Sequence, residues 1–254
     1  MNADERLAII QRKVERAKSH FKDLEIVKDA FIKTEPYTIG CEPDPKPGHE
    51  GLHRFFLTSL GEIDPNIALI AGDIVHNLRS ALDHLACQLV LVNGQPIADE
   101  TGFPIFKGTE INEATFARKV KGMTVAAKDR IRATEPYKNG KGGDLWVLHK
   151  LDIADKHHTL LTTLVHVGGV EIPSKGGLYN FLFPAFAVPN FGDALEIGKP
   201  FFTCKLEEYE NLRVTFDVGI SEENVFGPKS ILWVMDRLIV TVDNVILNFK
   251  SELA

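Results

Sequence analysis

Apolar residues recur at helical spacing between Pro65 and Val92, and this pattern predicts one long helix. One arc of its helical wheel carries Ile74, Leu78, Ala81, Leu82, Leu85 and Leu89. The other arc carries Asp73, His76, Asn77, Arg79, Ser80, Asp83, His84 and Gln88. This polar arc has neither Lys nor Glu, which a solvated helix face normally carries. We therefore expect the polar arc to face a neighbouring element or a ligand, and to mark a functional site.

A second periodic pattern predicts a long helix from Asn2 to about Phe31. Its apolar seam consists of Leu7, Ile10, Val14, Ala17, Phe21 and Leu24. Asn2 and Glu5 have the spacing of a capping box at its start. So narrow a seam suits packing along another long helix, either within the chain, which is the simpler arrangement, or across a dimer.

Strand-like patterns occur in two parts of the chain. Tyr37–Glu42 and Arg54–Leu60 flank a Pro/Gly-rich stretch and predict a hairpin. Later strands are predicted at Leu160–Val167, Leu178–Ala187, Pro200–Leu206 and Leu212–Val218. Further helices are predicted at Asn112–Val120, Thr124–Ala133, Asp144–His158 and from Ser230 to about Leu253.

This order of elements predicts an α+β fold. We expect a helical bundle with long N-terminal and central helices, a late antiparallel β-rich insertion, and a closing C-terminal helix. The expected parts are a mainly helical part over 1–158 with a short hairpin near 37–60, a β-rich part over 159–227, and a helix over 228–254 that packs back on the bundle. We expect them to form one compact unit.

Composition and charge restrict the possible partners and the cellular location. The net charge of −6 gives no general attraction to nucleic acid, so contact with RNA would require a local basic patch. Cys41, Cys87 and Cys204 are widely spaced, which argues against a disulfide framework and fits a reducing cytoplasm. The sequence has no signal-peptide pattern and no uninterrupted apolar span, so we expect a cytoplasmic protein without a membrane partner.

Arg79 and His84 form the string R-x4-H on the polar arc of the central helix. The stretch Gly72–Leu91 around it resembles the motif of the HEPN superfamily, whose helical proteins often act as metal-independent endoribonucleases and often form dimers. The resemblance implies that Arg79 contacts the scissile phosphate in a groove between two copies. It implies that His84 transfers a proton, with the 2′-hydroxyl as nucleophile. A guanidinium pairs well with phosphate oxygens and an imidazole titrates near neutral pH, so the chemistry is reasonable. His76, Asn77 and Asp83 are expected to assist.

A second polar cluster lies on the helix predicted over Asp144–His158. It consists of His149, Asp152, Asp155, Lys156, His157 and His158. If it packs beside the central helix, Asp155 is expected to orient His84 or His76, and Lys156 and His157 to contact a phosphate. The alternative is a solvated helix end, where Lys and His interact favourably with the helix dipole.

Three function classes remain open. The preferred class is RNA binding or metal-independent RNA cleavage, with RNA and a second copy of the chain as partners. The second is a non-catalytic binding or assembly protein whose polar residues satisfy one another. The third is a metal-dependent hydrolase that uses the His/Asp clusters or the H-E-x-x-H string at His49–His53. That motif needs a helix, whereas this copy joins a Pro/Gly-rich stretch to a strand, so we expect neither a metal nor a cofactor. No DNA-specific motif is present.

Overall fold

The structure is a computed structural model of the chain. It describes residues 1–157, 161, 163–174, 177–179, 194–205, 213–222 and 225–254. The order of helices and strands confirms the predicted α+β class, with a late strand-rich region followed by a C-terminal helix. The chain forms two compact units. Unit 1 comprises Met1–Leu24, Leu69–Leu161 and Trp233–Ala254, and unit 2 comprises Glu25–Ala68 and Thr162–Leu232.

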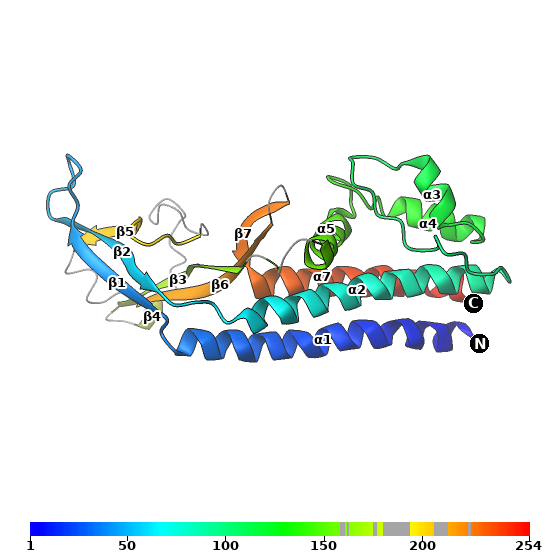
Figure 1. Cartoon of the computed structure of the whole chain (residues 1–254), viewed down its shortest axis with the longest axis horizontal. Coiled ribbons are helices and arrows are strands. Elements are labelled where there is room, and N and C mark those ends of the chain that lie inside the picture. The colour runs from blue at the N-terminus through cyan, green and yellow to red at the C-terminus, as the bar shows by residue number, and fades with distance from the viewer. Residues whose placement is uncertain (158–160, 162, 175–176, 180–193, 206–212, 223–224) are drawn as a thin grey trace. The chain divides into compact units, whose positions relative to one another are not determined.

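Unit 1 is built from helices (Figure 1). They are α1 (Ala3–Lys33), α2 (Pro65–Val92), α3 (Glu113–Lys119), α4 (Val125–Ala133), α5 (Gly143–His157), α7 (Ile231–Asn248) and the short 3-10 helix η1 (Lys250–Leu253). Helices α1, α2 and α7 each have one end within unit 2. None of the described helices is long and apolar enough to cross a membrane.

Local sequence explains where these helices begin and end. Asn2 and Glu5 form the predicted capping box, each side chain accepting a 2.9 Å hydrogen bond from the other residue's backbone N–H. Asn112 and Thr124 cap α3 and α4, so each of these helices begins one residue later than predicted. Helix α2 ends before Gly94, whose φ of +66° suits glycine.

The core of unit 1 lies where α1, α2 and α7 run alongside one another (Figure 1). The seam of α1 is buried at five of its six positions, the exception being the half-buried Phe21. The apolar arc of α2 is buried throughout. Arg6 of α1 donates a 2.8 Å hydrogen bond to Gln88 of α2, and Lys18 lies 2.8 Å from Asp243 of α7. The narrow seam therefore packs within the chain.

Unit 2 contains two antiparallel sheets. The first has the strand order β1 (Tyr37–Pro43), β2 (Leu52–Leu60) and β5 (Pro200–Lys205). The second has the order β4 (Gly177–Tyr179), β3 (Thr163–Ser174), β6 (Arg213–Glu222) and β7 (Phe226–Ser230). The predicted hairpin is present, and it pairs through β2 with a strand far along the chain.

The strand boundaries differ from the predicted ones in two places. Strand β7 includes Gly227 and Pro228, which the sequence analysis treated as a break before the last helix. A proline is tolerated there because β7 lies at the edge of its sheet. Of the predicted strand Leu178–Ala187, only its start falls in β4, since 180–187 lie outside the described residues, as do 160, 206 and 212.

Candidate anion-binding site of helices α2 and α5

The two polar clusters meet where α5 packs against α2 within unit 1. Gly72 lies against Asp155, and one turn further along α2 His76 lies 4.0 Å from Asp152. Gly72 allows this approach because a Cβ atom at its position would overlap the Asp155 carboxylate. Part of the polar arc of α2 is therefore held against a neighbouring element: Arg79 is buried, whereas Asp73, His76 and His84 are exposed.

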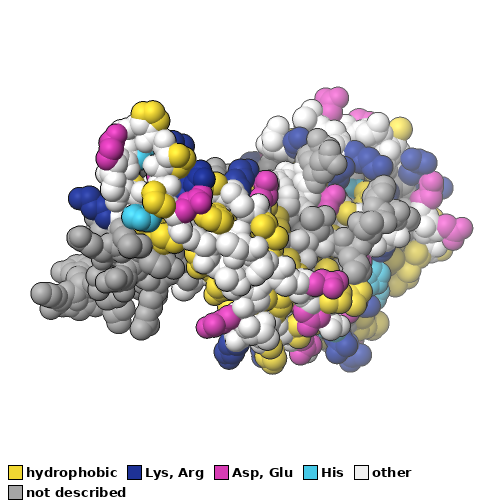
Figure 2. Space-filling view, turned by 60° about the vertical axis from the view of Figure 1, so that its left-hand side comes forward, with side chains coloured by type: hydrophobic (Ala, Val, Ile, Leu, Met, Phe, Trp, Pro, Cys, Tyr) yellow, Lys and Arg dark blue, Asp and Glu magenta, His cyan; other side chains and the backbone are white. Residues whose placement is uncertain are grey.

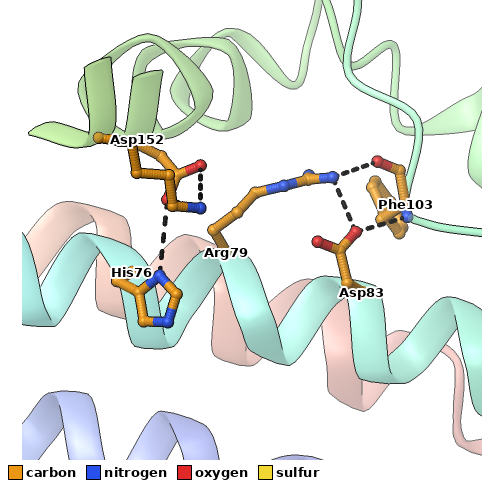
Figure 3. A network of polar contacts seen from close by, with 6 residues as sticks. His76, Arg79, Asp83, Phe103 and Asp152 are labelled. Atoms are coloured by element: carbon orange, nitrogen blue, oxygen red, sulfur yellow. Dashed lines mark hydrogen bonds and ion pairs between the residues drawn. The ribbon is translucent and has the colours of Figure 1, made fainter. Parts of the chain in front are cut away.

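Arg79 is the central residue of this site, and only 8% of it is exposed. Its Nη2 atom donates hydrogen bonds to Asp83 Oδ1 at 2.7 Å and to the Phe103 carbonyl oxygen at 2.8 Å. The backbone N–H of Phe103 donates to the same Asp83 oxygen at 3.0 Å. Figure 3 shows the guanidinium reaching from α2 towards both residues. Arg79 and Asp83 thus hold the segment that contains Phe103 against α2.

On the other side of the Arg79 guanidinium, two buried nitrogen atoms lack hydrogen-bond partners among the described residues. They are Arg79 Nη1 and His149 Nδ1. Burial, followed by the positive charges of Arg79, Lys107 and Lys119, outweighs Asp152 and lowers the pKa of His149 to about 4. His149 is therefore a neutral imidazole at pH 7.

A hollow of about 630 Å³ opens beside these atoms. Its lining comprises Arg79, Ile105, Phe106, Lys107, Gly108, Glu110, Ile111, Asn112, Glu113, Thr115, Lys119 and His149. We call it the Arg79 pocket. A second hollow of about 320 Å³ shares Arg79, Thr115 and Lys119 with it. Burial and then the Arg79 charge lower the pKa of Lys119, against the opposing charges of Asp83 and Glu100.

The other end of the α2–α5 contact is acidic. The buried carboxylate of Asp152 lies 2.8 Å from Lys156 Nζ and 4.0 Å from His76 Nδ1 (Figure 3). Burial and the negative charges of Asp152 and Asp73 raise the pKa of Asp155. Asp152 is therefore in ion-pair range of His76, and the charge of His76 also acts on Asp155, the residue expected to orient it.

The remaining predicted site residues lie apart from the pocket lining. His84 is exposed, and five residues along a helix separate its direction from that of Arg79 by about 140°. Asn77 donates a 2.8 Å hydrogen bond to the Asp73 carbonyl oxygen one turn earlier. His157 ends α5, but its side chain is not among those described, and His158 lies outside the described residues.

The H-E-x-x-H string lies in the β-hairpin. His49 is in the turn between β1 and β2, where its Nδ1 atom lies 2.7 Å from Asp44, and His53 is on β2. The two imidazoles therefore lack the helix that the metalloprotease motif requires. Among the residues that the structure describes, no group of three His, Cys, Asp or Glu side chains is placed to hold a metal ion.

Lys107 and Lys119 are the pocket residues that the sequence analysis missed. Both come from the stretch between α2 and α5, where short helices and loops follow one another. The sequence shows only that these lysines lie between the two polar helices along the chain. That position does not indicate that their side chains reach Arg79 or His149. Comparisons with protein-family models, with curated proteins and with solved structures give no match for this chain.

Proposed function

We propose that this protein binds RNA, and that the Arg79 pocket recognises a phosphate group of the RNA. The observation that carries the proposal is that the buried Arg79, the half-buried Lys119 and the exposed Lys107 line one hollow. Burial limits the solvent screening of the Arg79 charge. Guanidinium and ammonium groups are the usual partners of phosphate oxygens in proteins. Neutral His149 adds a ring nitrogen that donates or accepts a hydrogen bond, according to its tautomer.

The charges around the pocket favour an anion. Asp83 balances Arg79, and Glu113 is paired with Arg132 at 2.6 Å. Of the other charged lining residues, Lys107 and Lys119 outnumber the exposed Glu110. Burial and then the Arg79 charge lower the pKa of Lys119, and an anion that enters the pocket would counteract both effects. The attraction is therefore local, in a protein whose net charge is negative.

The binding experiment compares two lysines that lie two residues apart. Lys119 lines the pocket, whereas Lys121 is exposed and does not. We expect Lys119→Gln to weaken binding of a single-stranded RNA oligonucleotide about tenfold, because a charge-assisted hydrogen bond contributes on the order of 1.5–3 kcal/mol. Lys121→Gln, with the same change in charge, is expected to bind as the wild type does. Equal affinities for both variants in fluorescence anisotropy would count against the pocket.

The finer proposal is metal-independent cleavage of the HEPN type, in which Arg79 stabilises charge on the phosphate and His84 transfers the proton. His84 is exposed and so accessible to a substrate, but it faces away from Arg79 in its own chain. The proposal therefore uses a second copy of the chain, as the HEPN resemblance implies, with His76, Asn77 and Asp83 assisting. Asp155, Lys156 and His157 are proposed to contact the substrate further along α5.

Cleavage is tested on a mixed RNA pool in EDTA with wild-type protein, Arg79→Ala and His84→Ala. We expect cleavage by the wild type alone, with both variants still folded by circular dichroism. Cleavage that survives either substitution would remove that residue from the mechanism. Binding without cleavage by the wild type would leave RNA recognition as the function.

A second candidate function is favoured by the closed network of Arg79, Asp83 and Phe103. In this alternative the polar residues are structural and the protein is a non-catalytic assembly factor. Lys119 separates the two candidates because it has no hydrogen bond in that network. A structural role predicts that Lys119→Gln leaves RNA affinity unchanged, while Arg79→Ala lowers the melting temperature.

A further inference from the structure

The depth of Arg79 in its pocket restricts which phosphate can reach it. The residue is only 8% exposed, because Phe103 and Asp83 hold its Nη2 atom on one side and the pocket residues surround the other. A phosphodiester within an RNA strand has nucleotides on both sides, so the RNA would have to enter and leave the same hollow. A phosphate at a chain end enters from one side only.

The pocket is large enough to hold a group of the size of a nucleotide. Its volume of about 630 Å³ lies within the range of small-molecule sites, about 300–1,000 Å³. On the face shown in Figure 2, described Lys and Arg side chains lie interspersed with Asp and Glu side chains.

The charge of the pocket also favours a terminal phosphate over an internal one. A phosphomonoester carries about −1.5 to −2 charges at pH 7, because its second pKa is about 6, whereas an internal phosphodiester carries one. Lys107 and Lys119 line the pocket beyond the Arg79–Asp83 pair, and Glu110 opposes them, so the lining keeps an excess of one positive charge. This excess attracts a dianion more strongly than a monoanion.

We propose that the Arg79 pocket is specific for a phosphomonoester, at the end of an RNA strand or on a free mononucleotide. Arg79 and Lys119 contact the phosphate oxygens, and His149 and Lys107 contact the adjoining sugar or base. The proposal rests on the proposed RNA-binding function, and it narrows the ligand from RNA in general to a phosphorylated end.

The test uses one RNA sequence in three forms: with a 5′-phosphate, with a 3′-phosphate, and with hydroxyl groups at both ends. Adenosine 5′-monophosphate serves as the free nucleotide. Affinities are measured by calorimetry for the wild type, for Lys119→Gln and for the control Lys121→Gln. We expect at least one phosphorylated form to bind about tenfold or more tightly than the dihydroxyl form. Lys119→Gln is expected to remove that preference and Lys121→Gln to retain it.

Four results distinguish this inference from the broader proposal. Equal binding of all three RNA forms, weakened by Lys119→Gln, would overturn the phosphomonoester inference and leave RNA binding through the pocket in place. Binding of the mononucleotide alone, sensitive to Lys119→Gln, would support the phosphomonoester site and overturn RNA as the ligand. An end preference that Lys119→Gln does not change would overturn the assignment to this pocket. Absence of binding in every arm would overturn both proposals.

Discussion

Arg79 and Asp83 differ in exposure, and this difference makes their contributions to stability unequal. Arg79 is almost fully buried, whereas the side chain of Asp83 is 37% exposed and water can reach it. Removing Asp83 leaves a buried cation whose one remaining hydrogen-bond partner among the described residues is the Phe103 carbonyl oxygen. Removing Arg79 leaves a carboxylate that can be hydrated and that still accepts the Phe103 N–H.

We therefore expect Asp83→Ala to lower the free energy of unfolding by about 3–5 kcal/mol, and Arg79→Met by about 1–3 kcal/mol. The methionine keeps most of the packing volume while it removes the charge. The double variant is expected to lose less free energy of unfolding than the two single variants lose together, because neither charge remains unpaired in it. Urea denaturation measures all three values. A larger loss for Arg79→Met than for Asp83→Ala would contradict this account.

His149 gives the protein a dependence of stability on pH. Its pKa is about 4 in the folded protein and about 6.5 in the unfolded chain, so the unfolded chain binds more protons between these values. The free energy of unfolding is expected to fall by up to about 3 kcal/mol as the pH falls from 6.5 to 4. The charges that act on His149 are those of Arg79, Lys107 and Lys119, opposed by Asp152.

His149→Gln removes the titration while it retains a polar side chain. Denaturation at several pH values between 7 and 4.5 is expected to show a smaller loss of stability for this variant than for the wild type. Equal slopes for His149→Gln and the wild type would show that the imidazole does not titrate as described.

At the scale of elements, the approach of α2 to α5 depends on Gly72. Alanine in place of glycine within a helix normally stabilises it by about 1 kcal/mol. Here the added Cβ would meet the Asp155 carboxylate, so Gly72→Ala is expected to destabilise the protein by about 1–3 kcal/mol. In an Asp155→Ala background the same change is expected to be neutral or stabilising. Gly143→Ala is the control, since a Cβ at that first residue of α5 meets nothing.

Thermal denaturation of Gly72→Ala, Asp155→Ala and the double variant measures this coupling. Asp155→Ala alone is expected to raise the melting temperature by a few degrees at pH 7, because folding disfavours the ionised carboxylate, as its raised pKa indicates. Destabilisation by Gly72→Ala that persists without Asp155 would contradict the described packing of the two helices.

Elements with local signals could be predicted from sequence, whereas long-range pairings could not. Helix α2 has the predicted bounds because Asp64-Pro65 and Asn93-Gly94 act within a few residues of its ends. The pairing of β2 with β5 joins segments about 150 residues apart, and neither strand specifies its partner in its own sequence. Strand β7 was missed because a Gly-Pro pair is usually a break, and only its edge position makes it compatible with a sheet.

The same distinction applies to the candidate site. Arg79 and His149 could be selected because each lies on a helix whose polar residues are unusual for a solvated face. Lys119 could not be selected, because a lysine near the end of a short helix is normally solvent-facing. Its role depends on the placement of the chain after α2, which brings Gly102 close to both Asp83 and Lys119.

At the scale of the whole molecule, every residue that lines the Arg79 pocket belongs to unit 1. Phe55 of β2 is fully buried in unit 2, where its ring lies 6.1 Å from that of Phe202. We expect Phe55→Ala to lower the stability of unit 2 by about 3–5 kcal/mol while ligand affinity at the pocket stays at the wild-type value. Calorimetric unfolding and RNA binding at 15 °C measure the two quantities. A parallel loss of affinity would show that the pocket depends on the core of unit 2.

Unit 1 consists of three chain segments, and the two segments of unit 2 lie between them in the sequence. Most of α7 belongs to the last segment of unit 1. Phe249, just beyond α7, packs edge-on against Phe103, with ring centroids 6.3 Å apart. Phe103 is the residue whose carbonyl oxygen holds Arg79. During synthesis, Arg79 and its pocket lysines therefore leave the ribosome long before the aromatic ring that fixes their surroundings. The surroundings of Arg79 can therefore become complete only after the last segment of unit 1, which carries most of α7, has been synthesised.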